Sequence, residues 1–77
     1  MARLPRDVRP ERALRALQRL GCEVVRQRSS HVVIRRVDNP RLAAVLVMHP
    51  GRALRVGNLD DLLKQLNISI EAFLEEY

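Results

Sequence analysis

Three short runs rich in valine and isoleucine occupy the middle of the chain and constrain its fold more than any other feature. The runs are Cys22–Arg28, His31–Arg36 and Leu42–Met48. β-Branched residues are enriched in strands because their side chains pack well on a pleated surface. The stretch Asp38–Pro40, with sequence Asp-Asn-Pro, is a strong turn signal between the second and third runs. The sequence therefore predicts three consecutive antiparallel strands.

Helical periodicity precedes these strands. Pro10 suits the first turn of a helix, where its missing N–H is not needed. Gly21 follows the last apolar residue of the segment and supplies a C-terminal cap. The apolar residues at helical spacing are Ala13, Leu14, Leu17 and Leu20. On the opposite side, Arg12, Arg15 and Arg19 form either the solvated face of an amphipathic helix or a set of secondary contacts to a polyanion.

Two further helices are predicted after the strands. Asn58 is expected to cap the first of them and to place Asp60 and Asp61 in its first turn, where carboxylates suit the helix dipole. Its apolar stripe consists of Leu59, Leu62, Leu63 and Leu66. Ser69 is expected to cap a short last helix. The apolar side of that helix, Ile70, Phe73, Leu74 and Tyr77, packs either on its own domain or on a second copy or a partner protein.

The predicted order is therefore α-β-β-β-α followed by a short α. This is an α+β fold in which two helices cover one face of a three-stranded antiparallel sheet. A chain of 77 residues buries only about 60% of its unfolded surface, so we expect a single domain over residues 1–77. Residues 1–9 are expected to form a flexible basic arm. The sequence has no apolar run long enough to cross a bilayer and no signal-peptide core, and its single cysteine favours the reducing cytoplasm.

The charge balance indicates a polyanionic partner. The chain has 14 basic and 9 acidic residues, for a net charge of +5. Phosphate contacts dominate the affinity of proteins for nucleic acids. All the basic residues except Lys64 are arginine, which suits bidentate contact with phosphate. After Arg55 the charged residues are acidic except for Lys64, which favours a different partner for the C-terminal part.

Ser29 and Ser30 are expected to close a tight hairpin between the first two strands. The expected register pairs Arg28 with His31, Arg26 with Val33 and Val24 with Arg35, and allows a Glu23–Arg36 ion pair. Side chains alternate between the two faces of a sheet. The residues expected on the open face are therefore Val24, Arg26, Arg28, His31, Val33 and Arg35. Those expected to face the helices are Val25, Gln27, Val32 and Ile34.

His31 would then lie among guanidinium groups on an open face. Positive surroundings favour the neutral imidazole, which is available as a general base. The arginines would bind a phosphodiester and stabilise the charge of a pentacoordinate transition state. Together these groups supply what is needed to activate a ribose 2′-hydroxyl against its own phosphate. The alternative interpretation is that His31 is an ordinary polar residue at the start of a strand.

No metal or other cofactor is predicted. Cys22 is the only cysteine, and the two histidines, His31 and His49, are 18 residues apart. A tetrahedral zinc site needs four clustered ligands at short spacings.

The stretch Arg19–His31, with sequence RLGCEVVRQRSSH, resembles the opening of the HicA-type toxins. In that family a helix is followed by a glycine, then by Arg-Gln, and then by Gly-Ser-His. The matching residues here are Gly21, Arg26, Gln27, Ser30 and His31. Val47–His49 is similar to the end of the third strand in the family, and Gly57–Leu59 is similar to the start of the second long helix.

The resemblance implies a double-stranded-RNA-binding-domain-like fold and a metal-independent endoribonuclease that cleaves mRNA. It implies that His31 is the catalytic residue and that a HicB-like antitoxin neutralises the protein. We expect Arg26, Arg28, Ser30 and Arg35 to contact RNA. The auxiliary candidates are His49, Arg52 and Arg55, of which His49 serves either as an acid for the leaving oxygen or as a structural residue.

Two positions depart from the family pattern. Ser29 replaces the glycine that a type II′ turn prefers at its first central position, and Met48 replaces the proline before His49. An active ribonuclease and a catalytically degenerate relative that only binds RNA or protein are therefore both consistent with the sequence. A structural subunit that assembles through the acidic C-terminus, including a homodimer, is a third class.

Overall fold

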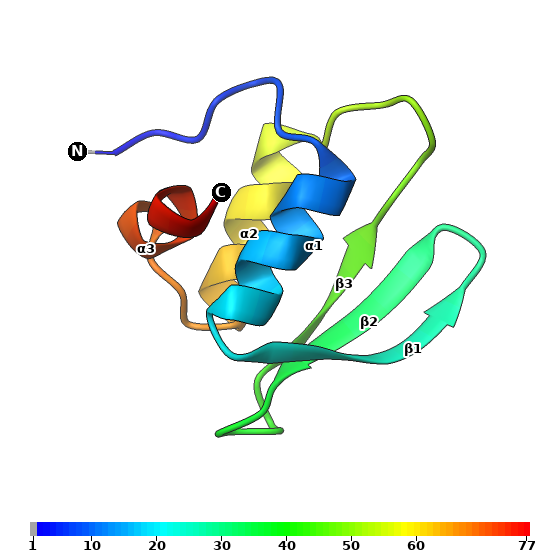
Figure 1. Ribbon diagram of the computed structural model, residues 1–77, viewed down its shortest axis with the longest axis vertical. Coiled ribbons are helices and arrows are strands. Elements are labelled where there is room, and N and C mark those ends of the chain that lie inside the picture. The colour runs from blue at the N-terminus through cyan, green and yellow to red at the C-terminus, as the bar shows by residue number, and fades with distance from the viewer. Residues whose placement is uncertain (1) are drawn as a thin grey trace.

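The sheet forms one layer of the molecule and the helices form the other (Figure 1). The computed structural model describes residues 2–77. Its elements are α1 (Pro10–Arg19), β1 (Cys22–Arg28), β2 (His31–Arg36), β3 (Ala43–Val47), α2 (Val56–Gln65) and α3 (Ile70–Glu76). The strands are antiparallel in the order β1-β2-β3. Helices α1 and α2 lie against one face of the sheet, and α3 lies on the far side of the helix pair. The predicted α+β, double-stranded-RNA-binding-domain-like fold is confirmed.

The helix ends follow from their residues. Pro10 is the first residue of α1, as predicted, and Gly21 follows its end with φ +94°. Asn67 adopts φ +56° after α2, and the N–H of Ile68 donates to the carbonyl oxygen of Leu63 at 2.9 Å. This is the hydrogen bond of a Schellman motif. The Ser69 hydroxyl accepts from the N–H of Ala72 at 3.0 Å, which confirms the predicted cap of α3.

The predicted cap of the second long helix was wrong. Helix α2 begins at Val56, with Arg55 as an N-cap residue that makes no side-chain capping bond. Asn58 therefore lies inside the helix, and the first turn contains no acidic residue. Burial of the apolar stripe, which begins at Leu59, stabilises this helix in place of a cap. Asp60 instead forms an ion pair with Lys64 one turn later, at 3.0 Å.

One hydrophobic core joins the sheet to all three helices. Its largest fully buried side chains are Val8, Leu17, Val32, Ile34, Leu46, Leu59, Leu63, Leu66 and Phe73. Val8 belongs to the expected N-terminal arm, yet it is 1% exposed and its carbonyl oxygen accepts from the N–H of Leu54 at 2.9 Å. The chain is thus attached to the domain before α1 begins. Met1, the first residue of that arm, lies outside the described residues.

The register of the first hairpin is confirmed near the turn and wrong farther from it. Arg28 pairs with His31 and Arg26 pairs with Val33, as predicted. Val25 then forms a β-bulge, which inserts one extra residue into β1 and shifts every pair beyond it.

Two details change as a result. Val24 pairs with Ile34 and so lies on the helix-facing side, where it is still 38% exposed, and the bulged Val25 is 48% exposed. Glu23 pairs with Arg35 and forms an ion pair with it at 3.4 Å, in place of the expected pair with Arg36.

Within residues 2–77, none of the helices combines the length and the apolar character that crossing a membrane requires.

Candidate nucleic-acid interface

The hairpin between β1 and β2 places its turn away from the helices (Figure 1). Arg28 and His31 are the last paired residues before the turn, so Ser29 and Ser30 are its two central residues. Ser29 has φ +56°, whereas Ser30 has no positive φ. A positive φ at only the first central position is typical of a type II′ turn, which favours glycine there. Ser29 therefore adopts a conformation that costs an L-residue about 1–2 kcal/mol.

Ser30 connects the turn to the third strand. Its carbonyl oxygen accepts from the N–H of Met48 at 2.7 Å, directly after the last paired residue of β3. His31 is exposed and pairs with Val47 on its other side. The main chain on both sides of His31 is thus hydrogen-bonded to a neighbouring strand. This arrangement fixes the backbone from which the imidazole projects and leaves the side chain accessible.

The open face of the sheet combines positive charge with valine side chains. Alternation along β2 places His31, Val33 and Arg35 on the face away from the helices. Arg26 and Arg28 on β1 share this face because each pairs directly with one of these residues. Ala43, Val45 and Val47 complete the face on β3. The structure therefore brings four of the five predicted residues, Arg26, Arg28, His31 and Arg35, to one surface, and Ser30 lies in the adjoining turn.

The three arginines of this face differ in their partners. Within the part of the chain that the structure describes, Arg26 and Arg28 make no side-chain hydrogen bond or ion pair, and both are exposed. Arg35 donates through Nη2 to Glu23 Oε1 at 3.4 Å, and its buried Nε has no partner there. Glu23 neutralises part of the charge that Arg35 would offer to a phosphate. Arg26 and Arg28 are therefore the most available cations beside His31.

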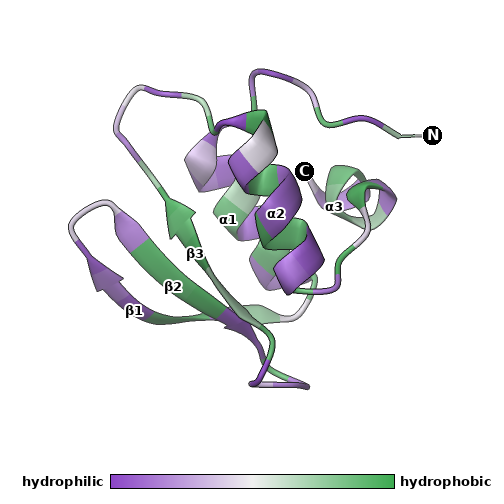
Figure 2. Cartoon of the chain, turned by 180° about the vertical axis from the view of Figure 1, so that it is seen from behind, coloured by the Kyte–Doolittle hydropathy of each residue, from purple (hydrophilic) through white to green (hydrophobic). Residues whose placement is uncertain are grey.

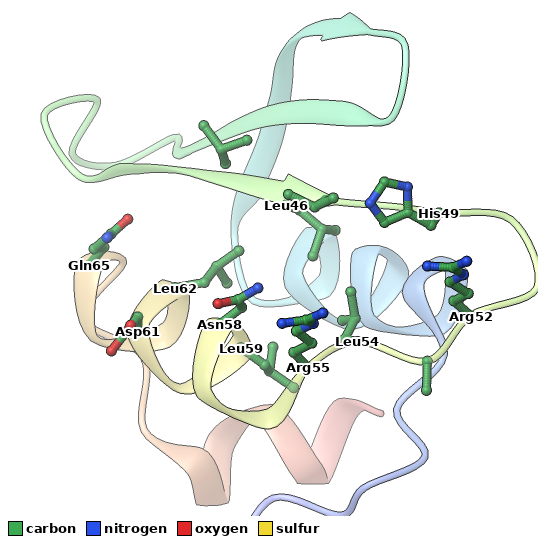
Figure 3. A pocket seen from close by; sticks show the side chains of 13 residues that line it. Leu46, His49, Arg52, Leu54, Arg55, Asn58, Leu59, Asp61, Leu62 and Gln65 are labelled. Carbon is green, nitrogen blue, oxygen red and sulfur yellow. The ribbon is translucent and has the colours of Figure 1, made fainter.

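The auxiliary candidates His49, Arg52 and Arg55 lie in a groove between β3 and α2 (Figure 3). The groove has a volume of about 510 Å³. Its apolar floor consists of Leu46, Leu54, Leu59 and Leu62. Figure 3 shows His49 and Arg52 at one end of the groove and Gln65 and Asp61 at the other. The two groups of candidates thus lie on different sides of β3, and Val47, the cross-strand partner of His31, also lines the groove.

Sequence reasoning did not identify Asn58 and Gln65 as residues of this groove. The sequence instead predicted Asn58 as a helix cap. With α2 beginning at Val56, Asn58, Asp61 and Gln65 recur at helical spacing and share one side of the helix. That spacing was the available signal.

The arginine ridge of α1 is largely used within the protein. Arg12 Nη2 donates to the main-chain oxygen of Tyr77 at 2.7 Å, and Arg19 Nη1 donates to that of Glu76 at 2.9 Å. Arg15, between them, has no such partner among the described residues. Arg12 and Arg19 therefore hold the C-terminal end of α3 against α1. Among these three arginines, Arg15 is the one that the structure leaves as a solvated side chain.

Within residues 2–77, no group of three histidine, cysteine or acidic side chains is arranged to hold a metal ion. What the open face offers is an accessible imidazole beside guanidinium groups, which is suited to binding a phosphodiester and transferring a proton.

Comparison with known families gives one match. The model of a family described as the HicA toxin of bacterial toxin–antitoxin systems matches residues 11–68. The match begins in α1 and ends in the segment that connects α2 to α3. No curated protein and no solved structure matches the chain significantly.

Proposed function

The chain belongs to the HicA family of toxins, and we propose that it is a metal-independent endoribonuclease that cleaves mRNA with His31 as the general base. The observation that carries the proposal is the position of His31. The side chain is exposed at the start of β2, its backbone is held from both sides, and Arg28 is its direct cross-strand partner.

In the proposed reaction the imidazole of His31 removes the proton of a ribose 2′-hydroxyl. The 2′-oxygen then attacks the adjacent phosphorus, and the bond from phosphorus to the 5′-oxygen breaks. The products are a 2′,3′-cyclic phosphate and a free 5′-hydroxyl, whose oxygen takes a proton from an acid or from solvent. Arg26 and Arg28 would hold the phosphodiester and offset the charge that develops on its oxygens.

The other candidates have supporting roles in this proposal. Ser30 orders the turn next to the RNA, and Arg35 adds a weaker phosphate contact because Glu23 already pairs with it. Arg52 and Arg55, between β3 and α2, contact RNA that continues past the end of β3. His49 lies at that strand end and is the candidate acid for the leaving oxygen.

Membership of a toxin–antitoxin family also indicates the regulation of the protein. An active ribonuclease in the cytoplasm needs a partner that neutralises it, and we propose a HicB-like antitoxin for that role. The antitoxin would inhibit cleavage either by covering the His31 surface or by preventing RNA from reaching it.

Replacement of His31 tests the catalytic assignment. His31→Ala is expected to fold normally, because the side chain is exposed, and to lose cleavage of an mRNA substrate by at least about 100-fold, a typical contribution of a general base. His49→Ala tests the candidate acid and should retain more activity than His31→Ala, because the leaving oxygen can also take its proton from solvent. Cleavage by the parent should be unchanged in excess EDTA. Full activity in His31→Ala, or loss of parent activity in EDTA, would refute the proposed mechanism.

The turn supports one alternative, a family member that binds RNA or protein without cutting it. Ser29 has a positive φ that glycine adopts without strain, so the turn that presents His31 is less favourable than in the family pattern. If the parent binds RNA and releases no 2′,3′-cyclic phosphate, this alternative holds.

A further inference from the structure

The two edges of the sheet differ sharply in how they are protected. An exposed strand edge presents unpaired N–H and C=O groups, and proteins protect such edges with charged side chains, prolines or bulges. Strand β1 has two of these protections, the bulge at Val25 and the charged residues Glu23, Arg26 and Arg28. Strand β3 has neither, since its sequence is Ala-Ala-Val-Leu-Val. Figure 2 shows β3 as uniformly hydrophobic, whereas β1 is hydrophilic toward the hairpin turn.

The hydrogen bonds show which main-chain groups of β3 point outward. The N–H of Arg36 donates to the carbonyl oxygen of Leu42 at 2.9 Å, just before β3. Just after β3, the N–H of Met48 donates to Ser30 at 2.7 Å. In an antiparallel pair alternate residues face the neighbouring strand, so the even-numbered residues of β3 bond to β2. The N–H and C=O groups of Ala43, Val45 and Val47 therefore face away from the sheet. No hydrogen bond to them from elsewhere in residues 2–77 is formed.

The groove beside this edge gives an added strand a place for its side chains. Val45, Leu46 and Val47 line it on one side, and α2 lines it on the other. A strand paired with β3 would direct alternate side chains onto the leucine floor of the groove and the others toward Val45, which is 48% exposed. Strand addition of this kind obtains affinity from main-chain hydrogen bonds and specificity from alternate side chains.

Charge indicates which polypeptide the edge accepts. Arg41 precedes β3, and Arg52 follows it. In an antiparallel pair of two β3 strands, the start of each lies beside the end of the other, so a second copy would bring these cations together. Like charges oppose that pairing. An extended segment with acidic residues at its ends would instead meet a complementary charge at both ends of β3.

RNA fits this edge less well than a peptide. Proteins that bind unpaired bases stack them on aromatic side chains. The chain has one phenylalanine and one tyrosine, Phe73 and Tyr77, and neither lines the groove. The leucine floor suits aliphatic side chains of a peptide.

We propose that the outer edge of β3 and the adjoining groove form a docking site for an extended, acidic-ended segment of the antitoxin, which adds a fourth strand to the sheet. The partner is taken from the toxin–antitoxin family and does not depend on the ribonuclease activity proposed for His31. The edge adjoins the His31 surface through Val47, the cross-strand partner of His31, so this contact would anchor the antitoxin while another part of it covers the catalytic face.

Amide hydrogen exchange of the full toxin tests the proposal directly. The probe is the protein encoded by the gene adjacent to the toxin gene, mixed with the isotope-labelled toxin and followed by NMR. The amides of Val45 and Val47 point to solvent, so their exchange should slow by at least about tenfold in the complex. The amides of Ala44 and Leu46 are internal controls, because β2 already protects them. Unchanged exchange at Val45 and Val47 in the complex, or no complex at all, overturns the proposal.

Two substitutions separate strand pairing from other modes of contact. Val45→Pro removes an outward N–H that the fold does not use and should weaken binding of the same protein by at least about tenfold. Val45→Thr keeps the N–H and the β-branched shape, so it should bind like the parent. Arg52→Glu should also weaken binding, whereas Arg15→Glu, the same charge change on α1, should not.

The results for the free toxin identify other occupants. Protection of Val45 and Val47 that rises with toxin concentration alone would assign the edge to a second copy. Protection by an RNA oligonucleotide alone would assign it to RNA. Either result overturns the proposal, whereas full RNA cleavage by His31→Ala would overturn only the mechanism proposed for His31. If Val45→Pro does not fold, the exchange rates of the parent still decide the question.

Discussion

Arg12 stacks on the ring of Tyr77, with its guanidinium carbon 4.1 Å from the ring centroid, and the same side chain donates to the main-chain oxygen of Tyr77 at 2.7 Å. The Tyr77 hydroxyl in turn accepts from the N–H of Arg9 at 2.7 Å. One turn earlier, Phe73 is fully buried, and its ring centroid lies 5.7 Å from that of Tyr77. The apolar side of α3 thus packs on its own domain, one of the two alternatives that the sequence left open.

Removing this packing should destabilise the isolated protein. Tyr77→Ala loses a cation–π contact, an aromatic contact and the acceptor for Arg9, together worth about 2 kcal/mol. For a domain of this size that corresponds to a fall in Tm of roughly 10 °C, measurable by circular dichroism. Arg15→Ala, on the same helix as Arg12, should melt like the parent.

Truncation after Asn67 is the stronger form of this test, because it also removes Phe73 from the core. The truncated chain should lose most of its cooperative unfolding transition. If it melts like the parent and loses only an antitoxin-bound or oligomeric state, α3 is an interface. Its packing on its own domain then contributes little to the stability of the isolated protein.

The sequence predicted the fold because its signals were local. Pro10, Gly21 and Ser69 act within one turn of their own position, and the bounds of β1 and β2 follow from β-branched residues next to a two-residue turn. The bulge at Val25 was not predictable in this way. Val24 and Val25 are both valine, so the alternation of polar and apolar residues does not show which one faces the core.

Part of the candidate site was predicted because its signals, too, are local in the sequence. His31, Arg26 and Arg28 lie near the hairpin turn, where the register is fixed by adjacent residues. The groove between β3 and α2 depends on how two distant elements pack, and the sequence carries only the helical spacing of Asn58 and Gln65 as a sign of it. The ion pair between Glu23 and Arg35 likewise depends on the bulge.

Ser29→Gly is predicted to stabilise the protein. Glycine relieves about 1–2 kcal/mol of strain at φ +56°, and its greater freedom in the unfolded chain offsets about 0.5–1 kcal/mol of that gain. The net increase in the free energy of unfolding should be about 0.5–1 kcal/mol, measured by urea denaturation. Ser30→Gly is the matched control and should not stabilise, because Ser30 has no positive φ. Equal effects of the two substitutions would contradict the assignment of strain to Ser29.

Cys22 is predicted to be unreactive in the folded protein. The thiol is 5% exposed, and burial raises its pKa above the ordinary value near 9.0, although the positive charge of Arg36 opposes the shift. Little thiolate is therefore present at pH 8, and iodoacetamide should modify Cys22 much more slowly in the native state than in urea. Rapid native labelling, followed by mass spectrometry, would show that the strand end opens readily.

The same shift predicts a loss of stability at high pH. The folded state holds the Cys22 proton more tightly than the unfolded state, so this contribution is complete below the ordinary thiol pKa near 9.0 and decreases as the pH rises through the higher folded value. Urea denaturation from pH 8 to pH 10.5 should show a steeper fall for the parent than for Cys22→Ala. A matched slope for the two proteins would mean that Cys22 ionises equally easily in both states.

The last prediction separates the arginines of the open face by their partners. RNA binding is measured in the His31→Ala background, so that the substrate stays intact, at several salt concentrations. Arg26→Ala and Arg28→Ala should each lower the salt slope by about 0.7–1, the value of one phosphate contact. Arg35→Ala should lower it less, because Glu23 lies 3.4 Å from the guanidinium. Glu23→Gln is the complementary variant, since it releases Arg35 and should strengthen binding. An unchanged slope for Arg26→Ala and Arg28→Ala would show that these side chains are only solvated charge, and the RNA surface would then lie elsewhere on the molecule.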